Sequence, residues 1–536
     1  MVAVVGGPDG SGRLQPIRDD GTPDAPAVEV DDLAAAVARH EADAPRWLWP
    51  SGAALYPRLV KAGVRVGRCH DLELTEALLV GYEGHWGEPR ALAASWARAN
   101  GLPVPADPPT VDAAPPGLTQ GTLFDELPPP ETGFDPLEAT LAGYRHQLAR
   151  TPDARFRLLV AAESAGGLVA VEMGQAGLPW RADAHDEVLH DLLGEPGALG
   201  APPRRLVELT GLINEAFGFR VHPESPAEVL RAFARVGITL PSTRSWVLRA
   251  VDHPAVPLLV EFKELHRVWT AHGWSWRAQW VRDGRFHPEY VAGGVVSGRW
   301  ATRGGGALQI PKVVRRAVVA DDGWTFVCAD ASQLEPRVLA AVAGDERLAA
   351  AAGSGDLYES LAADAFGGDR AKAKVALLGA MYGQTGGNAL PALAALQARF
   401  PTAWEYVERA ARTGQNGGLV RSWLGRTCPP APDEPLNPEQ ARARGRFTRN
   451  FVIQATAAEW ALALLAALRN GLRGTGSELV FFQHDEVMVH TPREHADAVV
   501  DAVRAAGEQA AHLLFGQTPV RFPLEISAVR CYADAS

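Results

Sequence analysis

The stretch that decides the fold is TFVCADASQLEPRVLAAVAGDERL, residues 325–348. Its apolar run, 326–329, ends on Asp330, and a helical pattern begins a few residues later. A short apolar run bounded in this way predicts a buried β-strand. Ser332 and Glu335 have the spacing of a capping box, and Pro336 suits the first turn of a helix. The stretch therefore predicts a strand, a turn and a capped helix, with a carboxylate at the end of the strand.

A second stretch, ELVFFQHDEVMVH at 478–490, places two apolar runs on either side of a polar turn. The pattern predicts a β-hairpin, although its turn lacks the usual Asn-Gly or Asp-Gly pair. Asp485 and Glu486 are adjacent carboxylates that repel each other unless a cation lies nearby, and Mg²⁺ binds carboxylate and phosphate oxygens. If Asp485 meets Asp330 on a neighbouring strand, the pair forms a cradle for two-metal phosphoryl transfer.

A third stretch, DRAKAKVALLGAMYGQTGG at 369–387, repeats Arg370, Lys374, Leu378 and Tyr382 every four residues. Such a row stays on one broad face of a helix and rises about 18 Å, which suits a nucleoside triphosphate. Cations at a helix N-terminus oppose the macrodipole, and the chain contains only five lysines. This favours a functional row over an ordinary amphipathic helix.

The charge of the chain is unevenly distributed. The net charge is -11, and residues 1–140 carry 10 Lys and Arg against 21 Asp and Glu, so the remainder is neutral. That remainder contains basic clusters, including ARARGRFTRN at 441–450 and RWATRGGGALQIPKVVRR at 299–316. Clusters of this kind indicate faces that bind phosphate backbones, and solvated surface charge is the alternative.

Other features narrow the class of protein. The four cysteines have no metal-ligand spacing, which predicts free thiols. We find no uninterrupted apolar run long enough for a bilayer, and the N-terminus lacks a signal-peptide pattern. We therefore expect no membrane partner and a cytoplasmic, nucleoid-associated protein.

Together the three stretches resemble motifs A, B and C of the family-A DNA polymerases, the bacterial DNA polymerase I group. VSGRW, LQIPK, GLVRSWLGRTCPP and RFTRNFVIQATAAEW also resemble segments of that family. The resemblance is firm over 286–536, weaker over 137–285 and faint before that. It implies an α+β, multidomain fold: a right-hand polymerase (palm, fingers, thumb) with an N-terminal RNase H-like α/β exonuclease-type domain.

The resemblance also implies boundaries along the chain. They are a degenerate 3′–5′ exonuclease-like domain at 1–100, a Pro-rich linker at 101–136, a helical thumb at 137–285, palm at 286–345 and 431–536, and fingers at 346–430. Of the exonuclease carboxylates only Asp71 is matched, so we expect that domain to be inactive. We also expect the 5′-nuclease domain of longer relatives to be absent.

Site residues follow from the same resemblance. It implies two Mg²⁺ ions, with Mn²⁺ as a substitute, on Asp330, Asp485, the Ala331 carbonyl and Glu486. Lys374 is expected to assist catalysis at the departing pyrophosphate. The implied nucleotide-binding residues are Gln333, Glu335, Tyr358, Arg370, Lys374, Leu378 and Tyr382, with Glu335 excluding a ribose 2′-OH. The implied DNA-binding residues are Arg299, Arg446, Asn450, Gln454 and His484.

The chain also departs from the pattern of the family. Leu378 replaces an aromatic residue and Tyr358 replaces a phosphate-binding His, while Ala331 replaces a Tyr and Pro336 replaces a Leu. The two metal-binding aspartates are retained, so we expect activity. We expect nucleotide affinity and sugar discrimination to differ from those of the family.

The expected function is template-directed addition of dNTPs to a primer 3′-OH, in DNA repair or replication, on primer-template DNA. Three alternatives are a bifunctional polymerase and 3′–5′ exonuclease, a non-catalytic DNA-binding factor, and a single-subunit RNA polymerase, which Glu335 disfavours. Gln120, Leu123 and Phe124 in the linker resemble peptides that bind the bacterial sliding clamp. A tether onto the protein's own surface is the other interpretation of that segment.

Overall fold

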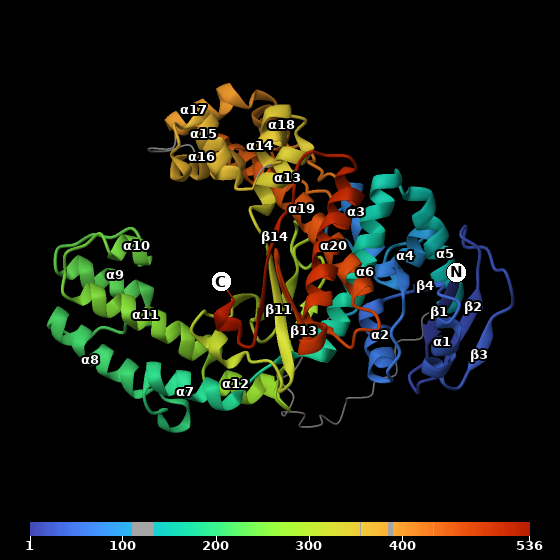
Figure 1. Ribbon diagram of the computed structural model, residues 1–536, viewed down its shortest axis with the longest axis horizontal. Helices are drawn as coiled ribbons and strands as arrows, with labels where there is room; N and C mark the ends of the chain where they lie inside the picture. The colour runs from blue at the N-terminus through green and yellow to red at the C-terminus, as the bar shows by residue number, and fades with distance from the viewer. Residues whose placement is uncertain (110–132, 354, 384–389, 433, 536) are drawn as a thin grey trace.

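A four-stranded antiparallel sheet in the order β12-β13-β11-β14 forms the centre of the molecule (Figure 1). The computed structural model describes residues 1–536 apart from 110–132, 354, 384–389, 433 and 536. The strands are β11 (Trp324–Ala331), β12 (Glu478–Gln483), β13 (Glu486–Pro492) and β14 (Leu524–Val529). The apolar run 326–329 is buried in β11 between two partner strands, and β12 and β13 form the predicted hairpin.

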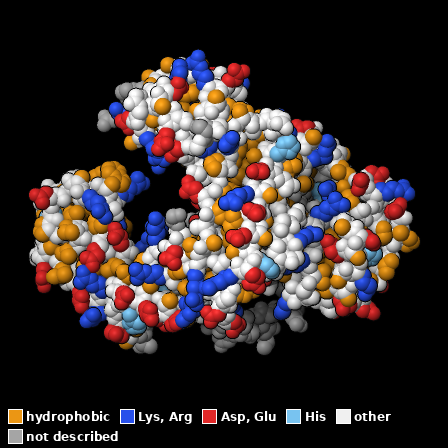
Figure 2. Space-filling view, in the orientation of Figure 1, with side chains coloured by type: hydrophobic (Ala, Val, Ile, Leu, Met, Phe, Trp, Pro, Cys, Tyr) orange, Lys and Arg blue, Asp and Glu red, His pale blue; other side chains and the backbone are white. Residues whose placement is uncertain are grey.

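Two helical lobes extend from this central part, one to the left of the sheet and one above it in the view of Figure 1. The first lobe contains α7 (Ala182–Leu193), α8 (Arg204–Phe217), α9 (Pro226–Arg235), α10 (Ser245–Leu248), α11 (Ala255–His272) and α12 (Trp274–Trp280). The second lobe contains α13 (Leu334–Val342), α14 (Glu346–Ala352), α15 (Leu357–Ala365), α16 (Arg370–Tyr382), α17 (Leu390–Arg399) and α18 (Pro401–Gln415). Figure 2 shows a deep hollow between the lobes, with Lys and Arg side chains on both sides of it.

Short strands connect the first lobe to the centre. They are β6 (Leu178–Pro179), β7 (Val281–Arg282), β8 (Arg285–Phe286), β9 (Glu289–Val291) and β10 (Ala301–Arg303). β6, β7 and β8 form one small sheet, and β9 pairs with β10 in another. The loop between β9 and β10 carries Arg299 toward the central sheet.

Three long helices lie beside the central sheet. α6 (Ala154–Ala176) and α20 (Ala496–Phe515) contact its strands, and α19 (Pro438–Gly471) packs against both of these helices. α19 begins with a capping box formed by Asn437 and Gln440. Among the described residues, α19 is the one helix long and apolar enough to cross a membrane. The apolar window is 89% buried inside the protein, as in the core helix of a globular fold.

The first hundred residues form an α/β unit with a five-stranded sheet in the order β3-β2-β1-β4-β5. Its strands are β1 (Val2–Gly6), β2 (Gly12–Pro16), β3 (Val28–Val30), β4 (Arg46–Trp49) and β5 (Arg68–Asp71). Its helices are α1 (Leu33–Glu41), α2 (Gly52–Lys61), α3 (Leu72–Tyr82) and α4 (Leu92–Ala99), and α5 (Pro136–Arg150) follows. That this unit is of the exonuclease type stays a prediction.

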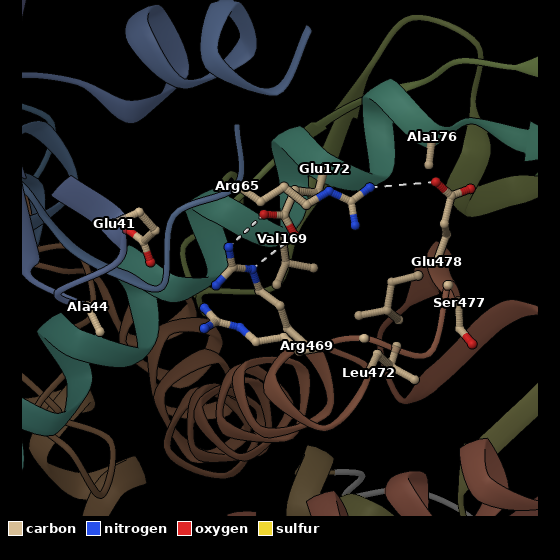
Figure 3. Close-up of a pocket in the computed structure, with 14 residues that line it drawn as sticks. Glu41, Ala44, Arg65, Val169, Glu172, Ala176, Arg469, Leu472, Ser477 and Glu478 are labelled. Carbon is tan, nitrogen blue, oxygen red and sulfur yellow. Dashed lines mark hydrogen bonds and ion pairs between the residues drawn. The ribbon is translucent and has the colours of Figure 1, made fainter. Parts of the chain in front are cut away.

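A buried arginine that is paired with a glutamate also joins this N-terminal unit to the rest of the molecule (Figure 3). Arg469, near the end of α19, contacts Glu172 of α6 at 2.6 and 2.9 Å and donates to the backbone oxygen of Gly67 at 3.0 Å. Arg65 lies 3.5 Å from Glu478 at the start of β12. These groups border a cavity of about 510 Å³, the one drawn in Figure 3.

Candidate active site

The ends of the central strands bring Asp330 and Asp485 together. Asp330 lies near the end of β11, and Asp485 lies in the turn between β12 and β13. β11 and β13 pair antiparallel with Asp330 opposite Glu486, and the amide of Ala331 donates to the Asp485 backbone oxygen at 3.0 Å. The backbone geometry therefore makes neighbours of two carboxylates that are far apart in the sequence.

Both carboxyl groups are electrostatically unfavourable as anions. Burial, followed by the charge of Asp330, raises the pKa of Asp485 to about 6. The Asp330 side chain is open to solvent on one side, but the surrounding protein still desolvates it. This desolvation and the charge of Glu525 raise the pKa of Asp330. Neither carboxylate has an ion-pair partner among the described residues, so a cation would relieve the repulsion.

A hydrated divalent ion fits this donor set. No group of three His, Cys, Asp or Glu side chains able to hold a metal occurs in the described part of the chain. The two aspartates would fill only part of the coordination shell of Mg²⁺. This ion commonly completes its shell with water and with phosphate oxygens of the substrate. The pair is therefore suited to a metal that arrives with a phosphate ligand.

Glu486 differs from these two aspartates. It accepts a hydrogen bond from the Tyr532 hydroxyl at 2.9 Å, and burial raises its pKa. It is also absent from the residues that line the cavity beside Asp485. The structure thus places Glu486 close to the aspartates in the sheet, with a protein partner of its own.

A cavity of about 240 Å³ lies against the two aspartates. It gathers predicted site residues from the β9–β10 loop, β11, the beginning of α13, α16 and the β12–β13 turn. Those lining it are Arg299, Asp330, Ala331, Gln333, Glu335, Leu378, Tyr382, His484 and Asp485, with Leu334, Pro336, Ala457 and Ala458 between them. Burial and the charge of Arg299 lower the pKa of His484.

Glu335 bridges two other side chains of this cavity. Its Oε1 lies 2.6 Å from Arg299, and its Oε2 accepts from the Tyr382 hydroxyl at 2.5 Å. The predicted capping box is therefore wrong. α13 begins at Leu334, its N-cap position is Gln333 at φ 57°, and no side chain caps it. Glu335 does not reach back to the helix start because tertiary partners occupy both its oxygens.

The predicted row on α16 lies on one accessible side of the helix. Arg370, Lys374 and Tyr382 are exposed and Leu378 is half-buried, whereas the intervening Ala373, Ala376 and Leu377 are buried. Leu378 and Tyr382 line the cavity, and Arg370 and Lys374 lie toward the other end of the helix. Burial raises the pKa of Tyr358, which packs beneath the two cations, to about 12.

Three predicted DNA-binding residues, at positions 446, 450 and 454, lie on α19. Arg446 is exposed, whereas Asn450 and Gln454 are half-buried, and none of the three lines the cavity at the aspartates. The buried Oδ1 of Asn450 has no hydrogen-bond partner in the described part of the chain. These residues stay candidates for contact with a longer ligand that extends beyond the cavity.

A family model, described as DNA polymerase family A, matches residues 205–530. The chain belongs to DNA polymerase family A. The match contains both aspartates, the α16 row and α19, so the geometry above and the family agree on the same segments.

Several relatives are similar to this family-A chain. DNA polymerase I of Deinococcus radiodurans is 25% identical over 58% of this chain and 36% of its own length. The thermostable DNA polymerase I of Thermus aquaticus is 27% identical over 53% of this chain and 37% of its own length. DNA polymerase I of Chloroflexus aurantiacus is 30% identical over 42% of this chain and 26% of its own length. The matches thus span about a third of these curated relatives.

A solved structure shares the fold. The POL domain of Pol1 from M. smegmatis, in complex with DNA primer-template and dNTP, superposes with a TM-score of 0.72 at 17% identity. The superposition covers 100% of this chain and 95% of that one. The polymerase fold expected from the sequence is therefore confirmed.

Three residues of this family-A site were missed by sequence reasoning. Asp356 pairs with Arg370, Tyr532 donates to Glu486, and the buried Arg337 donates to backbone oxygens of Ser332, Ala352 and Arg521. Arg337 follows Pro336 in the stretch 325–348. A charged residue in a segment predicted to be a buried helix could have indicated that it has polar partners. The other two partners are distant in sequence and left no local pattern.

Proposed function

We propose that this family-A chain is a template-directed DNA polymerase that joins dNTPs to a primer 3′-OH. In this reaction the primer 3′-hydroxyl loses its proton to water and its oxygen bonds to the α-phosphorus. The bond between the α-phosphorus and the oxygen that bridges to the β-phosphorus breaks, and pyrophosphate leaves. The observation that carries the proposal is the pairing of Asp330 with Asp485 at one end of the central sheet, beside a cavity. The expected place of action is the cytoplasm, on nucleoid DNA.

The carboxylates of Asp330 and Asp485 and the carbonyl of Ala331 would hold two Mg²⁺ ions, or Mn²⁺ in their place. Such ions lower the pKa of an attacking hydroxyl and neutralise charge on the reacting phosphate. Lys374 and Arg370 would bind the triphosphate along α16, and Lys374 would also stabilise or protonate departing pyrophosphate.

Specificity in this proposal rests on the walls of the cavity. Glu335 would exclude a ribose 2′-OH, and Tyr382 would lie against the nascent base pair. Arg299 and His484 would contact the primer end, since both line the same cavity as Asp485. Arg446, Asn450 and Gln454 would contact template and primer along α19.

The N-terminal unit is proposed to be a structural domain without nuclease activity. Its candidate carboxylate, Asp71, is buried and caps α3 by accepting from the amide of Leu74 at 3.0 Å. The other oxygen accepts from the amide of Gly52 at 2.6 Å. A carboxylate committed to two backbone amides on the interior is poorly placed to bind a metal and DNA.

The experiment is primer extension with Mg²⁺ by wild type and Asp485→Asn. Loss of one ligand should lower the extension rate by about 10²- to 10⁴-fold, because the metal contributes several kcal/mol to transition-state stabilisation. Asp322→Asn is the matched control, since Asp322 is an exposed acid that pairs with Arg530 away from the cavity. Equal extension by Asp485→Asn and wild type would refute the proposal.

A sliding clamp is a further proposed partner. Gln120, Leu123 and Phe124 lie outside the described residues, so this rests on the sequence alone. Replacing Leu123 and Phe124 by Ala should abolish clamp binding in a pull-down with the purified clamp. Unchanged binding would count against the motif.

A further inference from the structure

The beginnings of α15 and α16 meet through one aspartate. Asp356 caps α15, because its Oδ1 accepts from the amide of Glu359 at 3.0 Å. Its Oδ2 accepts from Nε and Nη2 of Arg370, at 3.1 and 2.7 Å. One oxygen therefore fixes the aspartate to its own helix, and the other holds the first cation of the α16 row.

The same end of α15 supplies a support for that cation. The Tyr358 side chain is 6% exposed, and its ring centroid lies 5.5 Å from Cζ of Arg370 and 5.9 Å from Nζ of Lys374. Both distances are within the range of a cation–π contact. Arg370 is thus held at one edge by a carboxylate and lies with Lys374 over one aromatic ring.

A hydrogen bond links the beginning of α15, which carries Asp356 and Tyr358, to the segment that follows Asp330. Gln333, three residues after Asp330, accepts from the amide of Leu357 at 2.9 Å. The contact joins the turn between β11 and α13 to the beginning of α15. The position of Arg370 is therefore linked to the position of the metal-binding carboxylates.

We propose that Asp356 is a positioning residue that orients Arg370 toward the triphosphate of the incoming nucleotide. This inference rests on the polymerase function proposed above. A guanidinium has five N–H donors, and Asp356 takes only those on the Nε edge. The Nη1–Nη2 edge stays available as a fork for two phosphate oxygens. Because the side chain is already ordered, nucleotide binding loses less conformational entropy.

The test is single-nucleotide incorporation by Asp356→Asn on a saturating primer-template. Asn keeps an oxygen that can cap α15 and removes the charge that holds Arg370. The KM for dNTP should rise about two- to fivefold, the size expected for losing a partly exposed ion pair. The kcat should change less than about twofold, since the chemical step does not use Asp356.

A second readout isolates the phosphate contact. Inorganic tripolyphosphate, which lacks base and sugar, should inhibit Asp356→Asn with an inhibition constant raised by the same factor. Asp153→Asn is the matched control, because Asp153 caps α6 at an exposed position and has no ion-pair partner in the described part of the chain. It should leave both constants unchanged. Asp356→Ser, which also offers a capping oxygen, should raise the KM in the same direction.

Three results separate the possibilities. An unchanged KM in both Asp356 variants would overturn the inference, and so would a lower KM, which would show that Asp356 competes with the triphosphate for Arg370. No extension by the wild type would instead overturn the proposed function. Extension by the wild type with an unchanged KM in the variants overturns only the role of Asp356.

Discussion

Glu335 shows how one side chain can have two tertiary roles at the residue scale. Its oxygens hold Arg299 and Tyr382, which come from the β9–β10 loop and from the end of α16. The side chain therefore links the sheet region to the second lobe. The contact also fixes its bulk inside the cavity that we assign to the nucleotide.

Replacing Glu335 by Ala should weaken discrimination between deoxyribonucleotides and ribonucleotides. Removing side-chain bulk opens room for a 2′-OH, and steric differences of this size are worth about ten- to a hundredfold in selectivity. The measurement is the ratio of kcat/KM for dNTP and rNTP. Glu335→Gln keeps the bulk and should retain the ratio; an unaltered ratio in Glu335→Ala would contradict the assignment.

Asp71 should make the stability of the protein depend on pH. Burial raises its pKa to about 7, and the amides of Leu74 and Gly52 only partly offset this. A carboxyl whose folded pKa is raised binds its proton more tightly when folded, so its contribution to stability falls as pH rises from about 4 to 7. As the pH rises from 5 to 7, the free energy of unfolding of the wild type should therefore fall by about 2 kcal/mol relative to that of Asp71→Asn.

Urea denaturation of both proteins at the two pH values measures this difference. Primer extension at pH 7.5 by the folded Asp71→Asn protein should match the wild type, because Asp71 caps a helix away from the polymerase cavity. A stability difference that does not change with pH would show that the carboxyl titrates normally.

At the scale of elements, the β12–β13 hairpin depends on a strained residue. His484 adopts φ 60°, a left-handed conformation that is unfavourable for residues with a Cβ atom. The turn nevertheless carries His because the ring lines the cavity beside Asp485. Stability and function therefore favour different residues at this position.

His484→Gly should be more stable than His484→Ala by about 0.5–1 kcal/mol. Both variants lose the ring, but only Gly adopts the left-handed conformation freely, and its greater unfolded-state entropy offsets part of that gain. Denaturant unfolding measures the difference, and both variants should bind primer-template more weakly than the wild type. Equal or reversed stabilities would show that the turn relaxes to a different conformation.

At the scale of the whole molecule, Arg469 holds three parts together. It joins α19 to Glu172 of α6 (Figure 3). It also donates to the backbone oxygens of Val66 and Gly67 in the N-terminal unit. Only 8% of its side chain and 12% of that of Glu172 is exposed. A pair this deeply buried is costly to break from one side.

Arg469→Met should destabilise the first unfolding transition by about 3–5 kcal/mol, because Glu172 is left buried without a cation and keeps only the hydrogen bond from the Tyr56 hydroxyl. Adding Glu172→Leu should recover part of the loss. The exposed Arg473→Met, one turn farther along, is the control and should change stability by less than about 0.5 kcal/mol. A loss in Arg469→Met no larger than in the control would show that the interface does not depend on the pair.

The sequence by itself determined the local elements and the candidates they carry. The apolar run before Asp330, the hairpin around Asp485 and the four-residue row on α16 are periodic or adjacent patterns, so each could be predicted from neighbouring residues. The resemblance to the family rested on the same short segments. Glu335 shows the limit, because its spacing suggested a cap and could not indicate competing partners.

Only the tertiary structure decided which side chains meet. The strand order placed Asp330 beside Asp485, packing of the second lobe directed Glu335 to Arg299 and Tyr382, and α15 brought Asp356 to Arg370. An ion pair has no sequence period, because Coulomb attraction depends on distance in space, which the packing of whole elements sets. The chain therefore encodes the chemical groups locally, whereas their partners and protonation behaviour arise from the assembled fold.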